Sequence, residues 1–141
     1  MRWATPVRVC TVACLLGGCA SGGVDPRLLG SADSQVKLRS IQSRAFDSGD
    51  TVKTLRTVMA TLQDLGFVLD KADSTMGTVS GTKLNDYALR ITVTVRPKGD
   101  TQVVVRANAQ MDQDTVGDPK PYQEFFAALQ KAMFLTAHNV D

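Results

Sequence analysis

Hydrophobic and polar residues alternate along two adjacent stretches in the second half of the chain, residues 88–96 and 101–110. Their apolar positions are Leu89, Ile91, Val93, Val95, Val103, Val105, Ala107 and Ala109. A period of two is typical of strands that bury one face. Pro97-Lys98-Gly99-Asp100 lies between the two stretches and predicts a hairpin turn.

The polar positions of the same two strands should share the opposite face of the sheet. They are Arg90, Thr92, Thr94, Arg96, Arg106, Asn108 and Gln110. Arginine supplies planar hydrogen-bond donors and is common where proteins bind each other, so we interpret this face as a candidate partner-binding surface. A solvated surface without a partner is the alternative.

Apolar residues at three- and four-residue spacings predict two helices. The first carries Val52, Leu55, Val58, Met59, Leu62 and Leu65; the second carries Tyr122, Phe125, Phe126, Leu129, Ala132 and Met133. Residues 47–50 offer N-cap side chains for the first helix, Gly66 should end it, and Asp118-Pro119 opens the second.

Shorter segments complete the predicted fold. Residues 67–71 and 78–83 read as strands, residues 37–46 as an extended edge strand, and residues 112–120 as a loop. The order strand, helix, strands in hairpins, helix predicts an α+β domain over residues 35–141. In it, two helices pack on one face of an antiparallel sheet.

The first 18 residues have the order of a secretory signal peptide. Arg2 and Arg8 precede a short apolar run, residues 9–16, which is too short to span a bilayer. Residues 20–34 are rich in Gly, Ser, Ala and Asp and predict a flexible tether. A buried strand, or a cleaved signal without lipid, is the alternative for the N-terminal segment.

Leu16-Gly17-Gly18-Cys19 resembles the lipobox of bacterial lipoproteins. Cys14 is a competing site, but Thr11 stands where the lipobox has Leu. The resemblance implies that the Cys19 thiol carries a diacylglycerol and that residues 1–18 are removed. Two or more acyl chains hold a protein stably at a membrane. Ala20, rather than Asp, after the cysteine implies the outer membrane and a periplasm-facing domain instead of retention at the inner membrane.

Residues 43–139 resemble a group of small bacterial lipoproteins of largely uncharacterised function. The stretches that carry the resemblance are residues 44–47, 62–67, 92–97 and 125–126 together with 131–135. No catalytic motif accompanies the resemblance. The layout also resembles, more loosely, the small modules of accessory lipoproteins in envelope machines.

The charge and the cysteine content of the chain reduce the number of functions that it could have. Removal of Arg2 and Arg8 leaves the basic residues equal in number to the 14 acidic ones, so a neutral mature chain is not expected to bind nucleic acid. The three cysteines all lie within residues 1–19, which leaves none for a disulfide or thiol catalysis in the domain.

Candidate chemistry is sparse. The single histidine, His138, sits near the C-terminus and cannot build a zinc site alone. Residues 112–118 begin like a calcium loop, but Val116 stands at its fifth position and Gln123 at its twelfth, where a bidentate Glu is needed. We therefore expect no enzyme activity, metal or cofactor.

The sequence favours a noncatalytic accessory or scaffold subunit of an envelope transport, secretion or outer-membrane assembly complex. It would be held at the membrane by lipid on Cys19 and bind an envelope protein. The alternative is a binder of a small or lipidic ligand, in a cavity between the helices and the sheet.

Overall fold

The computed structural model of the chain describes residues 26–84 and 87–138, with side chains placed for residues 34–84 and 87–135. The predicted signal peptide, Cys14, Cys19 and residues 20–25 of the tether lie outside the described residues. The elements in chain order are α1 (Pro26–Gln42), β1 (Ser43–Phe46), α2 (Thr51–Asp64), β2 (Val68–Asp73), β3 (Thr78–Leu84), β4 (Ala88–Lys98), β5 (Gln102–Met111), β6 (Asp114–Thr115) and α3 (Lys120–His138).

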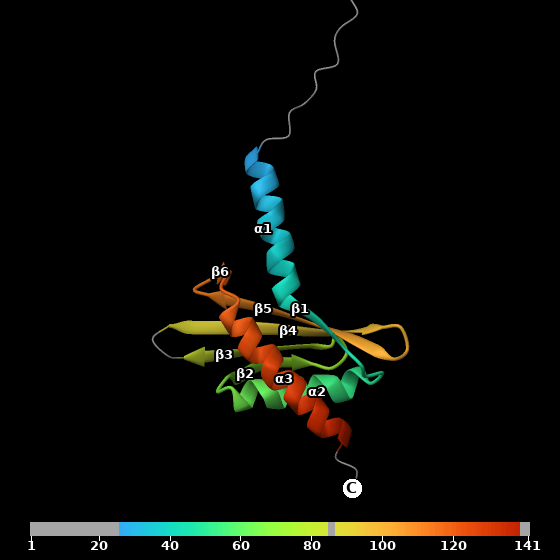
Figure 1. The fold of residues 1–141 in the computed structure, drawn as a ribbon. Helices are drawn as coiled ribbons and strands as arrows, with labels where there is room; N and C mark the ends of the chain where they lie inside the picture. Colours follow the sequence, from blue (N-terminus) through green and yellow to red (C-terminus); the bar gives the residue numbers. More distant parts are fainter. Residues whose placement is uncertain (1–25, 85–86, 139–141) are drawn as a thin grey trace, which may run out of the picture.

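The strands form one antiparallel sheet in the order β1-β5-β4-β3-β2, and β6 pairs with the far end of β5. Figure 1 shows α2 and α3 on the same side of this sheet, whereas α1 projects away from it. The predicted α+β fold, with two helices on one face of an antiparallel sheet, is confirmed.

The two long central strands alternate as the sequence predicts. Val93, Val95, Val103 and Val105 are at most 1% exposed, and the residues between them face the other side. The hairpin turn is shorter than predicted, because Lys98 pairs with Gln102 and only residues 99–101 turn.

Pro97 is therefore a strand residue, and the geometry explains why the strand tolerates it. Val95 N donates to Gly77 O just beyond the start of β3, at 2.8 Å. The nitrogen of Pro97 faces the same side, opposite residues that precede β3 in the chain. No ladder hydrogen bond is lost there, which is the usual condition for proline in a strand.

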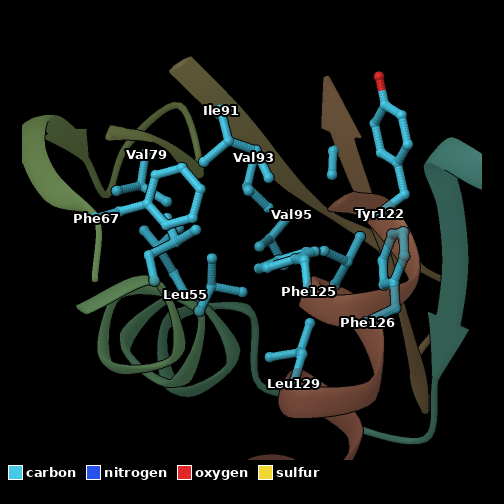
Figure 2. Close-up of a cluster of buried hydrophobic side chains, with 14 of the residues drawn as sticks. Leu55, Phe67, Val79, Ile91, Val93, Val95, Tyr122, Phe125, Phe126 and Leu129 are labelled. Carbon is cyan, nitrogen blue, oxygen red and sulfur yellow. The ribbon is translucent and has the colours of Figure 1, made fainter. Parts of the chain in front are cut away.

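The core lies between the sheet and the two helices. Figure 2 shows Leu55 of α2 and the α3 side chains Phe125, Phe126 and Leu129 facing the valines of the central strands. Asp50 caps α2, since its carboxylate accepts from Lys53 N at 2.9 Å, and Gly66 follows the helix with a φ of 86°. Both predicted helices are confirmed.

The first helix corrects two predictions. Residues 37–42 are helical rather than extended, and the predicted tether is helical from Pro26 onward, so α1 crosses the boundary expected at residue 34. Proline is favoured in the first turn of a helix. The side chains of residues 34–37 are exposed, so this part of the helix has no apolar stripe from which it could have been predicted.

The predicted loop at residues 112–120 contains a tight hairpin. Met111 pairs with Asp114, and the two residues between them, Asp112 and Gln113, have φ angles of 55° and 111°. Positive φ at both central positions is the geometry that two-residue hairpins favour. The strand β6 that results is too short to show a periodic pattern.

Tyr122 closes the gap that β1 and β6 leave along one edge of β5. Its hydroxyl donates to Val116 O at 2.8 Å and accepts from Ala109 N at 3.2 Å and Gln42 Nε2 at 3.3 Å. One fully buried hydroxyl thus joins the end of α1, the strand β5 and the start of α3.

Candidate functional site

The face of the sheet opposite α2 and α3 carries the polar residues that the sequence assigned to it. We define the open face by eleven outward polar residues on the three central strands and β1, and the outward side chain of Val104 lies beside them. Its members are Thr78, Ser80 and Thr82 on β3, Arg90, Thr92, Thr94 and Arg96 on β4, Arg106, Asn108 and Gln110 on β5, and Ser43. The structure thus brings all seven residues that the sequence assigned to this face together on one surface.

Strand pairing arranges the open face in rows that run across the sheet. The central row is Ser80, Thr92 and Asn108, and its members are half-buried. A second row begins at Thr78 and continues through Thr94, Arg106 and Ser43. Short hydroxyl and amide side chains in the middle leave a low surface with arginines toward both ends.

Arg90 occupies one end of the open face and has an acidic neighbour. Its Nε lies 3.8 Å from Asp70 Oδ2, which also accepts from the Thr82 hydroxyl at 2.7 Å. Sequence reasoning missed Asp70 and Thr82. Their contribution depends on the β2–β3 register and on the irregularity between Leu69 and Lys71, which no local pattern reveals.

Two shallow hollows open on this face. One, of about 300 Å³, is lined by Thr82, Ala88, Arg90, Gln110, Asp112 and Gln113. The other, of about 340 Å³, lies at the opposite end and is lined by Ser43, Thr94, Arg96, Val104 and Arg106. Each combines arginine with hydroxyl or amide groups, which suits polar contacts with another molecule.

A third hollow lies between α2 and the end of β2. It has a volume of about 510 Å³ and is lined by Val52, Leu55, Arg56, Met59, Ala72, Ser74 and Thr75. This groove lies between a helix and the sheet, as the predicted ligand cavity would. A hollow of about 340 Å³ at the start of α3 also does, and it is lined by Lys83, Tyr87, Leu89, Asp118, Lys120, Pro121 and Glu124. The centre of that layer is instead filled by large side chains, among them Phe125, Phe126 and Leu62, each at most 1% exposed.

The structure also bears on metal binding and on membrane-spanning helices. Within residues 26–84 and 87–138, no group of three or more His, Cys, Asp or Glu side chains is arranged to hold a metal ion. Asp118 of the calcium-like stretch instead accepts from Lys120 N at 3.0 Å, where α3 begins. None of the helices in the described part of the chain is long and apolar enough to cross a membrane.

The similarity of this chain to known proteins is limited to solved structures. No protein-family model and no curated protein matches the sequence. A crystal structure of a DUF4468 family protein from Bacteroides ovatus aligns with 67% of this chain and 80% of its own chain. The TM-score is 0.29 and the sequence identity 10%, and at this level of similarity we transfer neither family nor function.

Proposed function

We propose that this protein is a noncatalytic accessory or scaffold subunit of an envelope transport, secretion or outer-membrane assembly complex, and that it docks its protein partner on the open face. The observation that carries the proposal is the contrast between the two faces of the sheet. One face is covered by α2 and α3 (Figure 1). The other presents rows of hydroxyl, amide and guanidinium groups.

The anchor is a separate part of the same proposal. Lipid on Cys19 would hold the domain at the outer membrane, facing the periplasm, as the lipobox-like residues 16–19 and Ala20 favour. The helix α1 would then stand between the anchor and the sheet. Its 17 residues correspond to a rod of roughly 25 Å.

The ligand-binding alternative would use the groove lined by Val52 and Met59. Val52 is 46% exposed, so the groove is open along its side. Ligand pockets for small molecules usually enclose most of the ligand surface. The open groove therefore favours the docking proposal over the ligand alternative.

A quantitative pull-down tests the docking proposal. The membrane-extracted protein and its Cys19→Ser, Thr92→Arg and Gln123→Arg variants would be compared by mass spectrometry. Thr92 sits in the central row of the open face, whereas Gln123 is an exposed residue of α3 and receives the same new side chain. We expect a stoichiometric envelope partner that Thr92→Arg loses and Gln123→Arg keeps.

The Cys19→Ser variant tests the anchor separately, because it should release the protein from the membrane fraction and weaken capture. Equal capture by the Thr92→Arg and unmodified proteins would exclude the open face as the docking surface. If no form captures an envelope protein, the accessory-subunit proposal fails.

A further inference from the structure

Four arginines in the described part of the chain lie on strands, and their surroundings divide them into two pairs. Arg90 lies beside Asp70, and Arg44 stacks over the Phe126 ring with its guanidinium carbon 5.1 Å from the ring centroid. For Arg96 and Arg106, no carboxylate within the described residues lies at ion-pair distance. Their two positive charges are thus available to an outside group.

Strand pairing places these two arginines around one hollow. Arg106 pairs with Thr94 on one side and with Ser43 on the other. Arg96 pairs with Val104, two residues before Arg106 on β5, so the two arginines are diagonal neighbours. Diagonal positions are roughly 7–8 Å apart, a span over which long side chains converge.

This hollow has a volume of about 340 Å³, and the residues that line it are suited to bind an anionic group. Arg96 and Arg106 supply forked N–H donors, Ser43 and Thr94 supply hydroxyls, and no acidic side chain lines the hollow. Asp47, beyond the end of β1, is already engaged, since its carboxylate accepts from Gln102 Nε2 at 2.6 Å.

We propose that this hollow is a carboxylate-binding site, which receives a glutamate or aspartate side chain from an acidic segment of the partner protein. The proposal rests on the proposed function and names the chemistry that the open face recognises. A guanidinium fork pairs with a carboxylate in two parallel hydrogen bonds. The methyl groups of Val104, in the same lining, would contact the methylene stem of a glutamate.

The test measures binding of fluorescein-labelled hexaglutamate to the membrane-extracted, detergent-solubilised protein by fluorescence anisotropy at low salt. We expect Arg96→Ala and Arg106→Ala each to weaken binding by roughly tenfold or more, because charged hydrogen bonds are lost. Arg39→Ala removes the same charge from an exposed position of α1, outside the open face, and it should change affinity by less than about threefold.

Several outcomes would overturn the site. They are no binding of hexaglutamate, equal loss in all three variants, or displacement of the peptide by millimolar inorganic phosphate or phosphatidylglycerol vesicles. The last result would assign the arginines to phosphate groups rather than to protein carboxylates.

The pull-down separates this proposal from the docking function. If Thr92→Arg abolishes partner capture while Arg96→Ala and Arg106→Ala keep it in full, the open face docks the partner but the carboxylate site is wrong. If no open-face variant alters capture, the docking function itself fails. Loss of capture in Arg96→Ala and Arg106→Ala, with retention in Arg39→Ala, supports both.

Discussion

Two glycines with left-handed backbones differ in what surrounds them. Gly77 has a φ of 61°, and a Cβ there would lie 2.5 Å from Val95 O, whereas Gly99 has a φ of 65° and nothing within 4 Å of that position. Gly99→Ala should cost roughly 1–2 kcal/mol of unfolding free energy from backbone strain alone. Gly77→Ala should cost at least about 1 kcal/mol more, from the steric clash. Urea unfolding measures the loss of unfolding free energy in both variants. Equal losses would show that a Cβ at position 77 causes no additional steric clash.

The Tyr122 hydroxyl offers a second test at the scale of one residue. Tyr122→Phe leaves the N–H of Ala109 and the carbonyl of Val116 without this partner, so it should cost about 1–3 kcal/mol of unfolding free energy. Tyr87→Phe removes the same hydroxyl from a residue that is 50% exposed, and it should change stability by less than about 0.5 kcal/mol. Thermal or urea unfolding compares the two, and equal effects would remove the structural role of the Tyr122 hydroxyl.

Residue patterns predict which side chains are buried better than they predict which residues form hydrogen bonds or ion pairs with each other. The inward positions of β4 and β5 follow from alternation, because each strand has one covered face. The partners of Tyr122 could not be predicted, since Gln42 is 80 residues away and Ala109 is 13 residues away. Likewise, sequence reasoning placed Arg90 on the open face but could not find Asp70 beside it.

Helices and strands could be predicted from the sequence where one face of the element is apolar. The helix α2 buries Leu55, Val58 and Leu62 on one stripe, and the sequence shows that stripe directly. Among the described side chains of α1, Ile41 packs against the core of the domain and Gln42 is buried, both at the C-terminal end of the helix. Residues 34–37 are exposed, and no apolar stripe distinguishes them from a tether.

This difference predicts how the two helices respond to proline. Val36→Pro, at a position 65% exposed, should reduce the helical circular dichroism signal but leave the melting temperature of the domain unchanged. Arg56→Pro, at an exposed site in α2, should lower that temperature by roughly 10 °C or more, or prevent folding, because α2 covers the sheet. A large drop with Val36→Pro would show that α1 is part of the cooperative unit.

At the scale of the whole molecule, the sequence predicted the two layers and the polar composition of the open face. It did not predict which ends of that face carry free charge, because charge pairing depends on register. The bulge region of β2 brings Asp70 to Arg90, whereas the pairing of β1 with β5 adds Ser43 beside Arg106. Function therefore has to be argued from the assembled face rather than from either strand alone.

Native-state hydrogen exchange should show the same organisation as a gradient of local stability. The amides of β4 and β5 lie at the centre of the sheet and against the core formed with α2 and α3, so they should exchange only through global unfolding. Amides of residues 34–37 in α1 and of β6 should exchange through smaller local openings, because the side chains there are exposed. Protection in α1 equal to that in β5 would mean that the helix is fixed by contacts beyond those of the domain. In the membrane-anchored protein, such protection would mark the anchor side, rather than the open face, as the place where a partner holds the chain.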